Sequence, residues 1–293
     1  GVTWKGRSGM KKLMYTLALG ALVVGLGAAP PAAASDPSED CATCHEEIAA
    51  NFAHTVHAPR ERGGPSCATC HGNGDRHMEE GGDPALIGKP EGRDLETLCL
   101  ACHRDTEAMF SQRSVHSGAA VDCASCHNVH TTDPLQPQML HSTANQLCAS
   151  CHSSEAGSFN QPFGHRLDRG GMQCVSCHNP HGGAGEASLK VDRSGDVACV
   201  SCHAEKRGPF VFSHVSGVTG DCMTCHVPHG ASNPMALTRA RVDQLCLECH
   251  SPMGSTLGSQ PPSFHDMRSP RYQNCTTCHV MVHGSNTSPM LLK

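Results

Sequence analysis

Every cysteine in this chain belongs to a Cys-x-x-Cys pair that is followed directly by a histidine. The chain has 293 residues and 20 cysteines, so the pattern occurs ten times. The ten motifs are Cys41-Cys44-His45, Cys67-Cys70-His71, Cys99-Cys102-His103, Cys123-Cys126-His127, Cys148-Cys151-His152, Cys174-Cys177-His178, Cys199-Cys202-His203, Cys222-Cys225-His226, Cys246-Cys249-His250 and Cys275-Cys278-His279. Only 22 residues are histidine, so this regularity is not a chance arrangement.

The Cys-x-x-Cys-His pattern is the attachment signature of haem c. Two thiols add across the two vinyl groups of one haem, and the adjacent histidine binds the iron. Cys-x-x-Cys pairs also occur in zinc ribbons and dithiol redox sites, and an even number of cysteines fits a disulfide scaffold. None of these alternatives requires a histidine after every second cysteine. The sequence therefore predicts ten covalently bound haem c groups.

The composition leaves little material for a conventional core. The chain contains seven Phe, two Tyr and one Trp, too few large side chains for an apolar interior of this size. We expect the haems to form the core instead. The predicted fold is a multihaem cytochrome c that is mainly coil with short α-helices, two of them over 46–56 and 105–114, and no sheet.

Residues 1–34 have the pattern of a leader and a cleaved secretory signal peptide. Two lysines precede an apolar stretch at 13–29, and three alanines at 32–34 form a small-residue cleavage site. We therefore expect export and cleavage before Ser35. The leader holds four basic and no acidic residues, which leaves 18 basic and 27 acidic residues, a net charge of about −9. Such an acidic chain is not expected to bind nucleic acid.

The motifs occur in pairs that define a repeat. Paired in order, they start at Cys41, Cys99, Cys148, Cys199 and Cys246, which are 58, 49, 51 and 47 residues apart. Self-similarity at such a period is typical of arrays in which each unit contacts its neighbours. We predict one cytochrome domain over 35–293, an elongated array of five di-haem repeats at about 41–98, 99–147, 148–198, 199–245 and 246–293.

Each repeat also holds two histidines outside its motifs. The leading histidine precedes the second motif of its repeat: His57, His116, His165, His214 and His265. The trailing histidine follows the second motif: His77, His130, His181, His229 and His283. His54 and His141 have no periodic counterpart, and we expect them at the surface or beside haem propionates. His54 is the alternative to His57, and the 12 methionines offer another axial ligand.

Ten spare histidines for ten motifs predict two imidazole ligands for every iron. The histidine of each motif, called here the motif histidine, would bind one face, and a leading or trailing histidine the other. A trailing histidine three residues after a motif histidine cannot reach the far face of the same haem, because three residues span at most about 10 Å. It must serve another haem. We expect the trailing histidine to bind the first haem of its own repeat and the leading histidine the second.

Several stretches resemble the periplasmic decahaem cytochromes of the MtrA/DmsE type. They are NFAHTVH at 51–57, CATCHGNGDRH at 67–77 and FHDMRSPRYQNCTTCHVMVHGSN at 264–286, and the resemblance covers nearly all of 41–285. It implies a line of bis-His haems inserted into an outer-membrane β-barrel porin. Electrons would pass between periplasmic carriers and an outer-surface multihaem cytochrome, a mineral or a soluble acceptor. Such a conduit serves extracellular electron transfer in metal reduction or iron oxidation.

The ligand count favours an electron-transfer protein over an enzyme. A haem with both axial positions filled has no open site for a substrate, so we expect no catalytic residues. One alternative is a free periplasmic electron shuttle or store. A multihaem reductase with one five-coordinate haem and a subunit of an extracellular cytochrome filament are the others.

Overall fold

The computed structural model describes residues 37–58, 64–106, 114–118, 121–131, 137–167, 171–192, 194–214, 222–250, 265, 267 and 269–292. The predicted signal peptide and its cleavage site lie outside the described residues. The chain divides into two units, 1–36 and 37–293, and the second holds all ten motifs.

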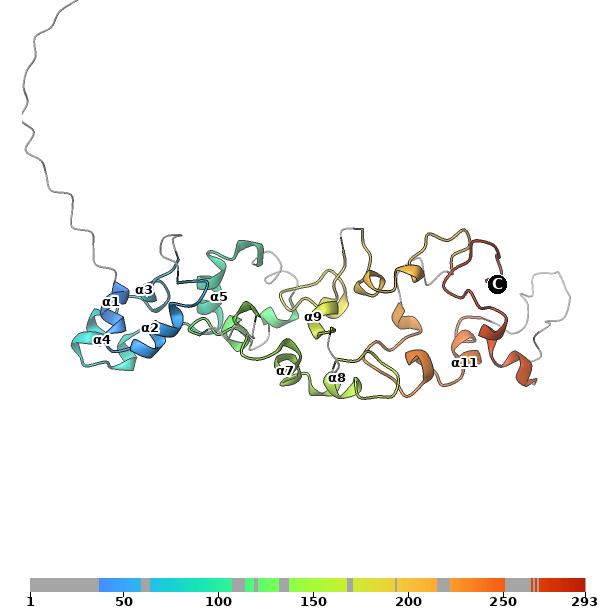
Figure 1. The fold of residues 1–293 in the computed structure, drawn as a ribbon, viewed down its shortest axis with the longest axis horizontal. Helices are drawn as coiled ribbons and strands as arrows, with labels where there is room; N and C mark the ends of the chain where they lie inside the picture. Colours follow the sequence, from blue (N-terminus) through green and yellow to red (C-terminus); the bar gives the residue numbers. More distant parts are fainter. Residues whose placement is uncertain are drawn as a thin grey trace, which may run out of the picture. The chain divides into compact units, whose positions relative to one another are not determined.

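Short helices joined by loops make up the second unit (Figure 1). The α-helices are α1 (Pro37–Ala42), α2 (Glu46–Phe52), α3 (Cys67–His71), α4 (Asp75–Glu79), α5 (Gly92–Leu100), α7 (Ala144–Ala149), α8 (Ser153–Ser158), α9 (Cys174–Cys177) and α11 (Val242–Cys246). The 3-10 helices are η2 (Pro84–Leu86), η3 (Val115–Gly118), η4 (Cys123–Ser125), η5 (Pro137–Met139), η6 (Glu186–Ser188), η7 (Ala198–Ser201), η8 (Ala204–Lys206), η9 (Cys222–Thr224), η10 (Pro234–Ala236), η11 (Pro270–Tyr272) and η12 (Cys275–Thr277).

This architecture confirms the predicted fold class, mainly coil with short helices. Among the described residues there are isolated β-bridges but no strand. The helix expected over 46–56 begins at Glu46 and ends at Phe52, and the one expected over 105–114 falls mostly outside the described residues. Within the described part, no helix has the length and apolar character needed to cross a bilayer.

The described chain has almost no apolar core of its own. Its buried apolar residues are Ala144, Ala231 and Leu237, all of modest size. Other apolar side chains, such as Val56, Val115 and Met235, are exposed. Burial of apolar side chains is the main force that normally holds a domain together. The protein part alone therefore lacks the interior that a domain of this length requires.

Each motif folds as one helical turn. In nine motifs the backbone N–H of the motif histidine donates to the carbonyl of the first cysteine at 2.9–3.0 Å. The remaining motif, Cys67–His71, forms helix α3. In such a turn residues i, i+3 and i+4 share one face, so both thiols and the imidazole project to the same side. The turn thus presents the two attachment atoms and one iron ligand together.

Capping residues fix where these turns begin. Asp122 precedes the fourth motif, and its carboxylate accepts hydrogen bonds from the backbone N–H of Ser125 at 3.0 Å and of Gly92 at 2.9 Å. The first bond caps η4, and the second ties it to the start of α5, which ends beside the third motif. Hydrogen bonds from Gly92 and Ser125 hold the pKa of Asp122 below its ordinary value. One carboxylate therefore joins two successive haem motifs.

We predict that Asp122→Ala lowers the free energy of unfolding by about 1 kcal/mol at neutral pH, because a helix cap is lost. The folded-state pKa is lowered, so this contribution is present above pH about 4 and is lost as the pH falls through the lowered pKa. Chemical unfolding followed by Soret circular dichroism at pH 7 and pH 3 measures it. Glu80→Ala, at an exposed position, is the matched control. A loss as large at pH 3 as at pH 7 would contradict the role of the carboxylate.

Candidate haem-ligand pairs

The ten motif histidines each lie beside one leading or trailing histidine. Ring centroids in these ten pairs are 5.8–6.3 Å apart. The pairs are His45–His77, His57–His103, His71–His130, His116–His152, His127–His181, His165–His203, His178–His229, His214–His250, His226–His283 and His265–His279. Every predicted ligand histidine is therefore used once.

The separation within these pairs fits one metal ion between two imidazoles. A bond from a metal to an imidazole nitrogen is about 2 Å, and the ring radius adds about 1 Å on each side. Two rings that share one iron therefore have centroids about 6 Å apart. Among the described residues, no cluster of three or more His, Cys, Asp or Glu could hold a metal. The donor set suits haem iron, which needs two axial ligands, rather than a four-ligand zinc site.

Burial favours the neutral form of several leading and trailing histidines. Desolvation, reinforced in each case by a nearby histidine or other cation, lowers the pKa of His57, His130, His181, His229 and His283. A neutral imidazole has a free lone pair, which is the form that binds iron. These histidines are thus held in a ligating state.

The expected assignment of spare histidines within a repeat is wrong for most of the chain. The trailing histidine lies beside the first motif of its own repeat only for His77, and the leading histidine beside the second motif only for His265. In every other case the partner belongs to a neighbouring repeat, as His57–His103 and His71–His130 illustrate. The chain-length argument that a trailing histidine cannot serve the adjacent haem agrees with these positions.

In each repeat, the histidine of the second motif is oriented by a backbone carbonyl. The Nδ1 atoms of these five histidines lie 2.7–2.9 Å from carbonyl oxygens. The pairs are His71–Gly88, His127–Gln138, His178–Ala187, His226–Met235 and His279–Met290. A carbonyl only accepts, so Nδ1 carries the proton and Nε2 is left as the iron ligand. Such partners fix the tautomer and ring direction of a metal-binding histidine.

The loops that supply these carbonyls contain rare backbone conformations. Gln138, Ala187 and Met235 have φ of 59°, 49° and 56°, and the residue after each is also left-handed. Residues other than glycine seldom adopt such angles, because Cβ crowds the next carbonyl. Sequence reasoning did not find these residues. The available signal was a leucine two positions after each, at Leu140, Leu189 and Leu237.

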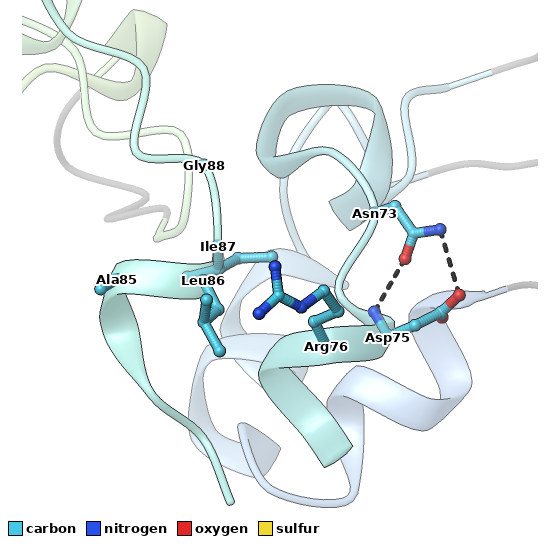
Figure 2. A pocket seen from close by; sticks show the side chains of 7 residues that line it. All are labelled: Asn73, Asp75, Arg76, Ala85, Leu86, Ile87 and Gly88. Carbon is cyan, nitrogen blue, oxygen red and sulfur yellow. Dashed lines mark hydrogen bonds between the residues drawn. The ribbon is translucent and has the colours of Figure 1, made fainter. Parts of the chain in front are cut away.

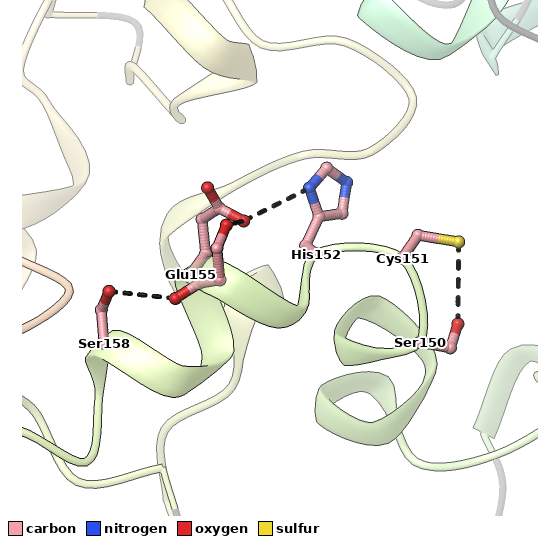
Figure 3. A network of polar contacts seen from close by, with 6 residues as sticks. Ser150, Cys151, His152, Glu155 and Ser158 are labelled. Atoms are coloured by element: carbon pink, nitrogen blue, oxygen red, sulfur yellow. Dashed lines mark hydrogen bonds and ion pairs between the residues drawn. The ribbon is translucent and has the colours of Figure 1, made fainter.

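A first-motif histidine can have a different partner. In the fifth motif, the Nδ1 atom of His152 lies 4.0 Å from a carboxylate oxygen of Glu155 (Figure 3). A hydrogen bond from Ser154 lowers the pKa of Glu155, so the carboxylate is charged at neutral pH. The first-motif histidine of this repeat therefore faces a carboxylate, whereas its second-motif histidine faces a backbone carbonyl.

A cavity of about 610 Å³ lies beside the second motif (Figure 2). Asn73, Asp75 and Arg76 line one side and residues 85–88 the other. Asp75 is fixed by Asn73, whose amide donates to its carboxylate at 3.1 Å. The guanidinium of Arg76 lies beside Ile87. A guanidinium pairs well with carboxylates, so this wall can accept a haem propionate.

The two histidines without periodic counterparts do not join the ring pairs. His141 lies against the fourth motif, where its Nε2 atom is 2.8 Å from the carbonyl of Ala124. This bond uses the nitrogen that would otherwise be offered to iron. His54 is exposed and, among the described rings, stacks on no other histidine. The structure thus places His57, not His54, in a ligand pair.

Thiols of successive motifs lie close enough to influence one another. Interactions between them affect the pKa of cysteines in eight of the nine successive pairs of motifs. In the first, third, fifth and ninth pairs the two first cysteines are hydrogen-bonded, as with Cys99 and Cys123. In these eight pairs the predicted haem attachment points of successive motifs therefore lie close together.

Comparison with known proteins identifies the family of this chain. The family model described as a doubled CXXCH motif matches residues 116–157, 165–208 and 214–255. The multiheme cytochrome MtrA of Shewanella baltica (strain OS185) is 34% identical over 269 residues, which is 85% of this chain and 78% of that protein. The chain belongs to the MtrA family. Like the other members of the MtrA family, it is a multihaem c-type cytochrome, and its function is electron transfer.

We predict that His181→Ala leaves one iron with a single axial ligand. The oxidised variant should show one high-spin ferric haem per chain by EPR, because the ring that faces His127 at 6.0 Å is gone. His141→Ala is the matched control and should stay entirely low-spin, since its ring binds the carbonyl of Ala124. High-spin signal from the control, or none from His181→Ala, would contradict the assignment.

Proposed function

We propose that this chain carries ten covalently bound haem c groups, each with two histidine ligands. We further propose that it is the periplasmic part of a conduit that moves electrons across the outer membrane. The observation that carries the proposal is the set of ten histidine pairs, one per motif, with centroids 5.8–6.3 Å apart. Bound haems of this kind supply one-electron transfer and no open site for substrate.

The residues of the chain hold and orient the haems. The motif turns present two thiols and one imidazole on one face, and the carbonyls behind the second-motif histidines direct Nε2 toward the iron. The leading and trailing histidines close the opposite face, which excludes water and exogenous ligands from the metal. Filled axial positions favour conduction over the reductase alternative.

The succession of attachment points supports a conducting role. Leading and trailing histidines lie beside motif histidines of a neighbouring repeat, so neighbouring repeats would share their haem sites. An array in which ring pairs join every repeat to the next suits electron transfer from the first repeat to the last.

The proposed setting follows from membership of the MtrA family and from the sequence. We propose export by the signal peptide at 1–34 and a location in the periplasm, in association with an outer-membrane β-barrel porin. The donor would be a periplasmic electron carrier. The acceptor or partner outside would be a multihaem cytochrome, a mineral or a soluble compound, in metal reduction or iron oxidation. The acidic mature chain favours docking to basic carriers or a polar lumen.

We predict that the tagged chain, purified from detergent-solubilised outer membranes of its native host, brings down a β-barrel protein in 1:1 ratio. Mass spectrometry identifies the barrel, and the mass of the cytochrome counts its haems. A tagged soluble periplasmic cytochrome from the same host is the control. Recovery of the chain only from the periplasmic fraction, as a monomer even after cross-linking, would overturn the conduit and favour a shuttle. A stoichiometric high-spin haem in the native protein would favour the reductase.

A further inference from the structure

The ring pairs divide among the repeats in a regular way. Two pairs join each repeat to the next, so eight of the ten irons would lie at the four junctions between repeats. The remaining two pairs lie within the first and last repeats, at His45–His77 and His265–His279. No interior repeat has a ring pair of its own among the described residues.

The same rule holds at every junction. The leading histidine of one repeat faces the first-motif histidine of the next, as His116 faces His152. The trailing histidine of that next repeat reaches back to the second-motif histidine, as His181 reaches His127. Each junction therefore exchanges one histidine in each direction.

Protein contacts join the repeats independently of the rings at three of the four junctions. At the junction of the second and third repeats, Ser114 donates to the carbonyl of Pro180 at 2.8 Å. Phe163 and Ala231 exchange two backbone hydrogen bonds of 3.1 and 2.7 Å at the next junction.

Phe212 and Ser285 exchange two backbone bonds of 2.8 Å at the last junction. Ser285 is fully buried and Ser114 nearly so. In each case the residue two positions before a leading histidine contacts the loop around the trailing histidine of the next repeat. This contact sets the register in which the histidines are exchanged.

The family model gives a second view of the same unit. Its matches run from a leading histidine through the second motif of one repeat to the first motif of the next, as in 116–157. Each match thus contains one complete ring pair, such as His116–His152, 36 residues apart in sequence. The doubled motif of the family model is therefore offset by one motif from the repeats that begin at Cys41.

We infer that the unit of iron coordination is the junction between repeats, and that the first and last repeats act as caps. An interior repeat completes none of its irons alone, because each needs a histidine from a neighbour. The first repeat uses its trailing histidine, and the last repeat its leading histidine, to close the iron that has no neighbour. This inference rests on the proposed bis-His ligation and adds which histidine serves which haem.

The test compares the leading histidines of the two end repeats in the full chain. His57→Ala should give one high-spin ferric haem per chain by EPR. Adding Cys99→Ala and Cys102→Ala removes the third haem and should abolish that signal, because the iron that lost its ligand is gone. Adding Cys67→Ala and Cys70→Ala instead removes the second haem and should leave the signal in place. Mass spectrometry verifies nine haems in both.

The opposite end provides the matched case with the other outcome. His265→Ala should also give one high-spin haem. Here removal of the haem of the same repeat's second motif, by Cys275→Ala and Cys278→Ala, should abolish the signal. Removal of the first-motif haem, by Cys246→Ala and Cys249→Ala, should leave it. Either end alone decides the question if a variant at the other fails to fold.

The outcomes separate the inference from its foundation. A high-spin haem already present in the unaltered protein would overturn bis-His ligation itself. Low-spin native protein together with loss of the His57→Ala signal on removal of the second haem would overturn only the exchange register. No high-spin signal from His57→Ala would show that His57 is not a ligand, and would overturn the register at this junction.

Discussion

A pair of imidazole rings about 6 Å apart is the constraint on which the rest of this structure depends. The chain has few large apolar residues, and its described part buries only Ala144, Ala231 and Leu237 among apolar side chains. Helices as short as those of this protein are not stable by themselves in water. Haems bound between these ring pairs, as proposed, would add a large apolar surface to the hydrogen bonds that already join distant segments.

The loops around the second motifs accept backbone strain to orient a ligand. A left-handed residue other than glycine costs roughly 1–2 kcal/mol, and Ala187 and Ser188 form two in succession. The return is a hydrogen bond of 2.9 Å from His178 Nδ1 to the Ala187 carbonyl. That bond decides which nitrogen faces the iron. The same left-handed conformation occurs at Gln138 and Met235. We therefore attribute it to orientation of the histidine and not to packing within a single loop.

The sequence alone predicts the chemistry of the site, but not which histidines lie beside each other. The motifs identify the attachment cysteines and the motif histidines, because two thiols and one imidazole must meet a single haem. Equal numbers of motifs and spare histidines then predict two ligands per iron. The sequence does not predict which motif begins a repeat. A repeat of two motifs can begin at either motif, and the spacing between repeats is the same in both cases. The short length of chain before His130 prevents it from binding the haem of the motif that it follows. This length does not determine that His130 lies beside His71 rather than beside another motif histidine.

Backbone groups escaped prediction for a related reason. A carbonyl such as that of Met235 has no side-chain signature, and only the leucine two residues later marks the loop. The first repeat, in contrast, differs from the interior repeats in the spacing of its histidines. In the second, third and fourth repeats the trailing histidine follows the motif histidine by three residues, but His77 follows His71 by six. The longer interval accommodates α4 and lets the histidine turn back to His45.

The exchange of ligands also explains why the two ends of the array must differ from its middle. A repeat array is stabilised mainly by its nearest-neighbour interfaces, and its terminal units lack one of them. In this chain the missing interface would leave the first iron without a leading histidine and the last without a trailing one. His77 and His265 fill those positions from within their own repeats. Coordination at the ends is therefore closed by local chain geometry, and coordination between them by the fit of one repeat to the next.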